Sequence, residues 1–226
     1  MDLADMTWKG VEEYLKKRKD IILPFGAVEE HGYHLPLSTD GDIAIAVAEG
    51  LSKRCGVVVA PILWYGVCNT TRVFPGTITA DFDSFKAYVS DILRSIADSG
   101  FQRLYIISGH LGGSHVSALK EAARSTDLNV LFFDLTKVKS EDILETRAFH
   151  ACEAETSLML YLHPEKVDMT HAVDEEIVFD EFSMTSSVKI TKSGVWGTPS
   201  KASAEKGRAL FNRILESFSA GFLPVD

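Results

Sequence analysis

The chain has few cysteines, no long apolar run and no excess of basic residues. Its three cysteines, Cys55, Cys68 and Cys152, are odd in number and lack any paired spacing, so neither a disulfide framework nor a thiolate zinc site is supported. No unbroken apolar run reaches the length of a membrane span. The 32 acidic residues outnumber the 23 basic ones, so the chain lacks the net positive charge that typically binds a nucleic-acid phosphate backbone. We therefore expect neither a nucleic-acid nor a membrane partner.

The N-terminus also lacks a targeting signal. Its first twenty residues carry several acidic side chains and a lysine-rich stretch at 16–19, without the apolar core of a signal peptide. We therefore expect a cytoplasmic protein. Hydrophobic residues make up 46% of the chain and charged residues 24%, as in ordinary globular proteins. A length of 226 residues suits a sizeable core, and we expect residues 1–226 to form one domain.

Short apolar runs alternate with amphipathic stretches along the chain, which is the pattern of βα units and a mostly parallel sheet. The runs are uniformly apolar and predict buried strands at 21–25, 57–62, 104–107 and 130–133. Apolar residues at helical spacing predict helices at 43–51, 85–96 and 210–218. Segment 173–197 is harder to interpret, and its β-prone pieces at 177–179 and 188–190 suggest extra strands. The predicted fold class is α/β.

The loop after the first predicted strand is dense in potential metal ligands. Five such side chains lie between residues 29 and 40, namely Glu29, Glu30, His31, His34 and Asp40. Carboxylates and neutral imidazoles are the ligands that zinc, manganese and iron(II) accept. Two alternatives stay open: the side chains are solvated loop residues, or Asp40 caps the helix that follows.

A second histidine belongs to the same edge of the predicted sheet. Ser108, Gly109 and His110 directly follow the strand at 104–107, and ligand sites in parallel sheets gather beyond the carboxyl ends of strands. His110 can therefore converge with the loop at 29–40. Gly112 and Gly113 allow a tight turn into a helix whose first amides could bind an anion, although such junctions are often glycine-rich for steric reasons alone.

A third cluster occupies residues 150–157. If the segment is helical, His150 and Glu153 share one face while Glu155 lies on another. Acidic residues at the start of a helix also have a plain capping role, which is the alternative. Five of the seven histidines, His31, His34, His110, His115 and His150, lie in or directly beside the three clusters, and that concentration favours a functional site.

The run from Leu23 to Asp40 resembles the signature of the creatininase (creatinine amidohydrolase) family, whose members read Glu-Gln-His-Gly-Pro-His-Leu-Pro followed by an aspartate. Further segments match in order: 74–77 resembles the family's Phe-Pro-Gly-Thr, 109–110 its Asn-Gly-His, and 150–157 its His-Ala-Gly-Glu-x-Glu-Thr-Ser. The resemblance implies a three-layer α/β sandwich with a mostly parallel central sheet. It also implies two divalent ions (zinc, manganese or iron), hydrolysis of non-peptide carbon–nitrogen bonds, and a homo-oligomer, commonly a hexamer.

Carried over residue by residue, the resemblance gives ligand positions to Glu29, His31, Asp40 and His110, with Asp40 bridging both ions. It places His150 beside the substrate for proton transfer. Two ions a few ångströms apart can activate a shared water and polarise a carbonyl, while a nearby acid protonates the departing nitrogen.

This chain departs from the family pattern at several positions. Glu30 stands in place of glutamine, Tyr33 in place of proline and Ser108 in place of asparagine. Creatininase has a metal-binding glutamate where this chain has Gly112, which has no side chain to coordinate an ion. A fifth ligand must then come from elsewhere or be water, and Glu155 is the best candidate.

The substrate of creatininase itself fits this sequence poorly. Creatininase places tryptophans around its substrate near the third motif, whereas Trp8, Trp64 and Trp196 all lie outside residues 65–195. The segment at 68–72 replaces a histidine-bearing segment of the family with hydroxyl groups and an arginine.

Thr71 and Arg72, together with backbone amides near Gly112 and Gly113, would suit an anionic or phosphate end of a substrate. Arg72 could equally be a surface or interface arginine. We therefore predict a metal-dependent amidohydrolase acting on a small cyclic amide or formamide by a metal-activated water. The first alternative is a deformylase of a formylamino-ribosylaminopyrimidine monophosphate in flavin or deazaflavin synthesis. An alternative from another class is a catalytically silent metal-binding assembly subunit.

Overall fold

The computed structural model describes residues 1–147, 149–176 and 191–222. Its centre is a four-stranded parallel sheet in the order β2-β1-β3-β4. The strands are β1 (Asp20–Phe25), β2 (Val58–Val59), β3 (Arg103–Ser108) and β4 (Asn129–Phe133). The helices are α1 (Trp8–Leu15), α2 (Thr39–Cys55), α3 (Phe82–Asp98), α4 (Gly113–Ala123), α5 (Glu153–Leu162) and α6 (Ala204–Ser219). In the described residues, no helix is both long and apolar enough to cross a membrane.

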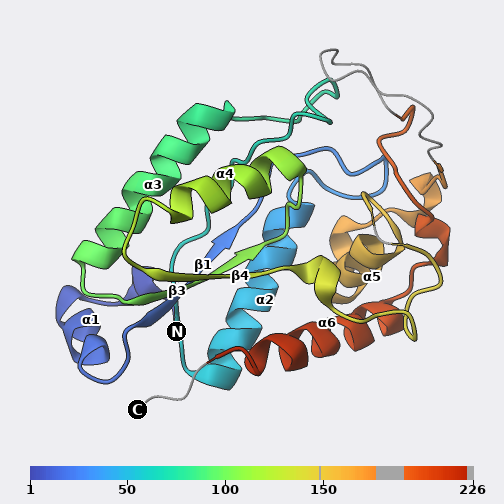
Figure 1. The fold of residues 1–226 in the computed structure, drawn as a ribbon. Coiled ribbons are helices and arrows are strands. Elements are labelled where there is room, and N and C mark those ends of the chain that lie inside the picture. Colours follow the sequence, from blue (N-terminus) through green and yellow to red (C-terminus); the bar gives the residue numbers. More distant parts are fainter. Residues whose placement is uncertain (148, 177–190, 223–226) are drawn as a thin grey trace.

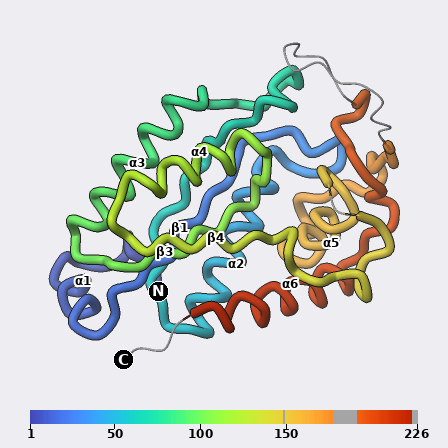
Figure 2. The backbone as a smooth tube through the Cα atoms, viewed as in Figure 1, coloured from blue at the N-terminus to red at the C-terminus, as the bar shows by residue number. Residues whose placement is uncertain are grey.

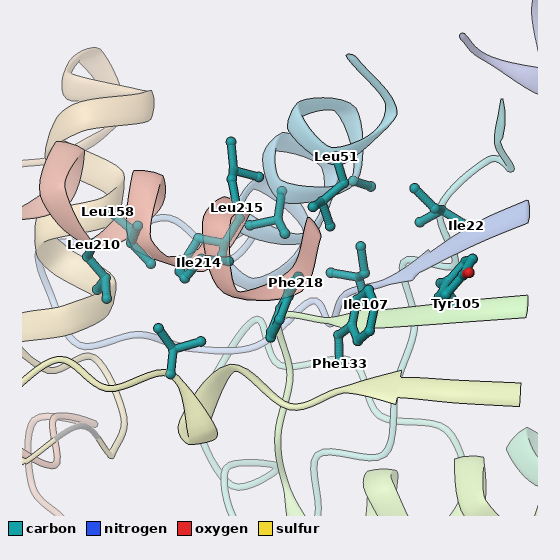
Figure 3. Close-up of a cluster of buried hydrophobic side chains, with 14 of the residues drawn as sticks. Ile22, Leu51, Tyr105, Ile107, Phe133, Leu158, Leu210, Ile214, Leu215 and Phe218 are labelled. Atoms are coloured by element: carbon teal, nitrogen blue, oxygen red, sulfur yellow. The ribbon is translucent and has the colours of Figure 1, made fainter. Parts of the chain in front are cut away.

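Helices cover both faces of the sheet, which gives three layers (Figure 1). Because successive strand residues point to opposite faces, Ile22 packs toward α2 and α6 while Ile21 and Leu23 pack toward α3 and α4. Figure 3 shows the first of these cores, where Ile22 and Ile107 from the strands face Leu51, Ile214 and other helix residues. The α/β sandwich predicted from the sequence is confirmed.

β2 is shorter than the strand predicted at 57–62. Ala60 still donates to the carbonyl of Ile22 and Leu63 to that of Pro24, so the chain continues beside β1. Pro61 between them has no amide hydrogen to donate, and a proline interrupts regular pairing. The predicted strand pieces at 177–179 and 188–190 lie outside the described residues.

The chain leaves β1 toward the side of the molecule where α5 lies (Figure 2). The loops after β1 and β3 meet at this edge, since Gly109 donates its amide hydrogen to the carbonyl of Phe25 at 3.0 Å. The start of α2 follows the first loop, and the start of α4 follows the second. This edge therefore collects two of the predicted site segments, 29–40 and 108–113.

Candidate metal centre

Gly109 allows the two loops to approach each other closely. A Cβ atom at this position would lie 2.0 Å from the backbone oxygen of Asp40, so any side chain here would push the two segments apart. The approach brings His110, the next residue, against the first turn of α2. The convergence of 29–40 with His110, expected from the shared direction of the parallel strands, is present in the structure.

Asp40 points toward two imidazoles and not toward the helix amides. Its Oδ1 lies 3.2 Å from His31 Nε2, and its Oδ2 lies 3.4 Å from His110 Nδ1. Ser38 occupies the N-cap position of α2, and Asp40 belongs to the first helical turn. The orientation is that of a carboxylate able to bridge two ions, which argues against the capping alternative.

Three buried atoms that could bind a metal ion, Glu29 Oε2, His31 Nε2 and Asp40 Oδ2, face only one another and His110, and have no hydrogen-bond partner outside this cluster among the described residues. The outer nitrogens of the imidazoles are occupied, because His31 Nδ1 lies 3.0 Å from the carbonyl of Glu29 and His110 Nε2 lies 3.1 Å from that of Val67. Backbone carbonyls of this kind orient metal-binding histidines. Buried polar atoms rarely stay unpaired, so their convergence indicates that the residues fit a bound cation.

The donor atoms fall into overlapping groups of three, each with all atoms within 4.8 Å of one another. One group is His31, Asp40 and Glu155, another is Glu29, Cys68 and His110, and a third joins Glu29 and His31 to His150. Glu155 is thus brought to His31 and Asp40 from α5, where the sequence hypothesis needs a fifth ligand. The ligand roles of Glu29, His31, Asp40, His110 and Glu155 stay predictions that this geometry supports.

Gly112 is also constrained by space. It precedes α4 as its N-cap residue, and a Cβ atom there would lie 2.6 Å from His110 Nε2. With this backbone, a glutamate side chain at 112 would displace the imidazole. Gly112 therefore leaves room for the His110 imidazole and supplies no ligand of its own.

The electrostatics of the cluster favour positive charge. Burial alone would lower the pKa of His31, but the charge of Asp40, its hydrogen bond and the charges of Glu155 and Glu29 raise that pKa to about 10. Glu29 and Asp40 likewise raise the pKa of His110 well above its usual value, against the effect of burial. Burial raises the pKa of Glu155. The neighbouring carboxylates therefore favour the protonated imidazoles, and a divalent ion would replace these protons on binding.

His150 lies before α5, beside the metal cluster. Its backbone pairs with Trp196 in an isolated antiparallel bridge, and the following Ala151 has a left-handed φ of 48° that turns the chain into the helix. His150 Nε2 lies 2.8 Å from the carbonyl oxygen of Glu30 and 3.1 Å from its Oε1. The ring centre lies 4.4 Å from that of His31. Because α5 begins at Glu153, the hypothesis that His150 shares a helix face with Glu153 is wrong.

Glu153 has a structural role and does not face the metal cluster. Its side chain is fully buried and accepts hydrogen bonds from the backbone amides of Glu145 and Thr146, from the Thr146 hydroxyl and from Lys206 Nζ. Burial opposes ionisation, but Lys206, Thr146 and the two amides lower the pKa of Glu153. It anchors the loop before α5 to α6 and belongs to none of the donor groups among the described residues.

A cavity of about 1110 Å³ opens onto the donor cluster. Of the predicted substrate-binding residues, Thr71, Gly112 and Gly113 line it. The Thr71 hydroxyl also donates a short hydrogen bond to Glu29 Oε1, so it orients a predicted ligand. Arg72 is exposed and is not among the lining residues, which fits the surface-arginine alternative better than a role inside the cavity.

The cavity wall includes an aromatic pair that sequence reasoning missed. Phe149 and Trp196 both line it, with ring centres 5.3 Å apart and planes inclined by 11°. Trp196 reaches the site through its backbone pairing with His150. The position of Trp196 outside residues 65–195 therefore did not exclude an aromatic wall. Phe149, next to His150 in the sequence, was the only local sign of an aromatic wall, because its partner Trp196 lies 47 positions further along the chain.

Comparison with known proteins agrees with this geometry. The family model for creatininase, described as creatinine amidohydrolase, matches residues 4–221. The chain belongs to the creatininase family. It is 29% identical over 245 residues to the creatinine amidohydrolase of Pseudomonas putida, covering 96% of this chain and 94% of that protein. As a member of this family it is an enzyme, a hydrolase of the creatininase (creatinine amidohydrolase) type.

Solved creatininase structures share the fold. A crystal structure of creatininase superimposes with a TM-score of 0.87 at 27% identity, covering 97% of this chain and 95% of that one. A manganese form of creatininase matches with a TM-score of 0.82 at 26% identity over 97% and 96% of the two chains. Metal binding is thus a property of the creatininases that this chain resembles in fold.

A further creatininase relative acts on a formamide. The 2-amino-5-formylamino-6-ribosylaminopyrimidin-4(3H)-one 5'-monophosphate deformylase of Methanosphaera stadtmanae is 25% identical over 133 residues, which is 58% of this chain and 53% of that protein. Family membership therefore leaves the substrate open.

Proposed function

We propose that this creatininase-family enzyme is a dinuclear amidohydrolase that hydrolyses a cyclic amide or a formamide in a small molecule. The two ions would be zinc, manganese or iron. Glu29, Asp40 and His110 would hold one ion, and His31, Asp40 and Glu155 the other. The observation that carries the proposal is that buried carboxylate oxygens and imidazole nitrogens of Glu29, His31, Asp40, His110 and Glu155 lie in overlapping groups, with Glu29, Asp40, His110 and Glu155 lining the cavity.

Bound at this position, two divalent ions would activate a water molecule and polarise an amide carbonyl. The chain's own residues would bind, orient and protonate the substrate. His150 lines the cavity beside the cluster and is held by Glu30, so it is placed to protonate the departing nitrogen. The parallel rings of Phe149 and Trp196 offer a flat wall, which favours a planar amide.

The test combines metal analysis with turnover. Purified protein would be assayed for bound metal and, loaded with zinc, manganese or iron(II), for hydrolysis of creatinine, other cyclic amides and formamides. We expect about two ions per chain and turnover of at least one planar amide, abolished by a chelator and restored by metal. Absence of stoichiometric metal after purification and after loading would contradict the proposal.

Deformylation of a phosphorylated formamide is the second candidate. The start of α4 supports it, because Gly112, Gly113 and Ser114 line the cavity at a helix N-terminus, where backbone amides can bind an anion. Formate release from the formylaminopyrimidine nucleotide would be compared with creatinine hydrolysis. Because Arg72 lies outside the cavity wall, Arg72→Ala should change KM little, whereas Gly113→Pro should raise KM mainly for the phosphorylated substrate.

A silent metal-binding assembly subunit would bind the same ions and hydrolyse none of these compounds, so the panel also separates this alternative. The remaining expectations are proposals of the same kind. We propose a homo-oligomer, by resemblance a hexamer, and a cytoplasmic location. Size-exclusion chromatography with light scattering tests the first, and fractionation of source cells tests the second.

A further inference from the structure

Cys68 lies beside the predicted ligands Glu29 and His110. It is 1% exposed and lines the cavity. Its Sγ, a carboxylate oxygen of Glu29 and a ring nitrogen of His110 all lie within 4.8 Å of one another. The spacing of the three cysteines in the sequence predicted no thiolate ligand. A spacing argument detects only sites built from several cysteines, whereas this group combines one cysteine with a glutamate and a histidine from distant parts of the chain.

The position of Cys68 is set by its backbone. Its amide donates to Thr79 Oγ1 at 2.8 Å. The preceding Val67 donates its amide to His115 Nδ1 at 3.3 Å, and its carbonyl faces His110 Nε2 at 3.1 Å. The segment is thus tied to the loop and helix that carry His110. The same contact occupies Nε2 of His110, so Nδ1 is left for a metal ion.

A second observation points to an ion at this position. Glu29 Oε2 is buried and faces His110 Nδ1 at 2.7 Å, with no hydrogen-bond partner outside the cluster among the described residues. A carboxylate oxygen, an imidazole nitrogen and a sulfur that face one point form the donor set that zinc binds tightly, while manganese prefers oxygen ligands.

We propose that Cys68 is a thiolate ligand of the ion held by Glu29, Asp40 and His110, and that it makes this position selective for zinc over manganese. The inference rests on the proposed metal centre. Binding forms a metal–sulfur bond and releases the thiol proton to solvent. Cys152 provides a comparison, since it is also buried and lines the cavity; its Sγ contacts Glu155 Oε2 at 4.0 Å, but it belongs to none of the donor groups among the described residues.

The experiment loads metal-free full-length protein with cobalt(II) and records the near-ultraviolet absorption. A cobalt–thiolate bond gives a charge-transfer band that oxygen and nitrogen ligands do not give. We expect the band in the wild type and in Cys152→Ser, and its loss in Cys68→Ser with cobalt still bound. Zinc affinity should fall at least tenfold in Cys68→Ser, and manganese affinity should change much less.

The outcomes separate this inference from the proposed function. Failure to bind any cobalt would overturn the metal centre and the inference together. Two bound ions without the band, or a band that survives Cys68→Ser, would overturn the role of Cys68 alone. If Cys68→Ser does not fold, cadmium-113 NMR of the wild type decides: one strongly downfield resonance supports a thiolate ligand, and none contradicts it.

Discussion

The imidazole of His150 is held by Glu30, whose carbonyl oxygen lies 2.8 Å and whose Oε1 lies 3.1 Å from Nε2. Glu30 occupies a position where the family pattern has glutamine, and its buried carboxylate gives this histidine a charged partner. The other oxygen, Oε2, accepts from the amide of Gly32 at 2.9 Å. Glu30 therefore acts as a positioning residue for the predicted proton-transfer group.

His150→Ala should leave metal content unchanged and lower kcat on the order of a hundredfold or more, as expected for a lost general acid or base. Glu30→Gln, which restores the family residue, should fold normally and reduce kcat less. Metal analysis and steady-state kinetics on the best substrate of the amide panel check both. Equal loss of metal in His150→Ala would reassign this residue as a ligand, which its grouping with Glu29 and His31 would then explain.

Asp40→Ala should remove both ions, because one carboxylate oxygen faces His31 and the other faces His110. The control is Asp42→Asn in the same helical turn, where the carboxylate pairs with Lys166 at 2.8 Å away from the cluster. Elemental analysis after metal loading should show nearly full occupancy in the control and almost none in Asp40→Ala. Retention of one tightly bound ion would show that Asp40 does not bridge.

Glu155→Gln should weaken one ion selectively, since Glu155 groups with His31 and Asp40 but not with Glu29 and His110. Loss of a charged ligand should lower the affinity for that ion about 10–100-fold. Calorimetric titration of metal-free protein should resolve one weakened and one unchanged site. The exposed Glu165 provides a control as Glu165→Gln, and identical titrations for the wild type and Glu155→Gln would contradict the ligand role.

Glu153→Gln should destabilise the protein without selective loss of metal. The substitution leaves Lys206 without its buried partner and weakens the contacts with the amides of Glu145 and Thr146. We expect a loss of about 3 kcal/mol in the free energy of unfolding, typical of a broken buried ion pair, measured by denaturant titration. Glu145→Gln, at an exposed carboxylate on the same lysine, should have little effect.

Tyr14 should make stability fall between pH 10 and pH 12. Burial is the main cause that raises the pKa of Tyr14 to about 12, and its hydroxyl donates to the Asp20 carbonyl at 2.8 Å and accepts from the Val58 amide at 3.1 Å. Because the unfolded chain releases this proton near pH 10 and the folded chain does not, the contribution is complete below pH 10 and lost on the way to pH 12. The loss is about 2–3 kcal/mol.

Denaturant titrations of the wild type and Tyr14→Phe across this range check the effect. The variant should be less stable near neutral pH, since its hydrogen bonds are gone, but its stability should decline less between pH 10 and pH 12. The difference between the two curves removes the contribution of other titrating groups. Parallel curves would show that Tyr14 ionises normally in the folded protein.

The amino-acid sequence alone determined the layered fold and indicated which loops carry the predicted metal ligands. Uniformly apolar runs at 21–25 and 104–107 predicted buried parallel strands, and strand direction placed Glu29, His31 and His110 beyond one sheet edge. These predictions depend on local hydrophobic pattern and on the geometry of parallel sheets. The chemical type of each residue and its position along the chain are enough to predict the strands and the sheet edge at which these side chains lie.

Only the tertiary structure decided which side chains from distant segments face this edge. Glu153 and Glu155 are two residues apart and chemically alike, yet one anchors a loop to α6 while the other reaches His31 and Asp40. Cys68 and Trp196 join the site in the same way, and Arg72 stays outside it. Their directions follow from how α5 packs, from the left-handed turn at Ala151 and from long-range backbone pairing. These are properties of the packed chain as a whole, and no local pattern encodes them.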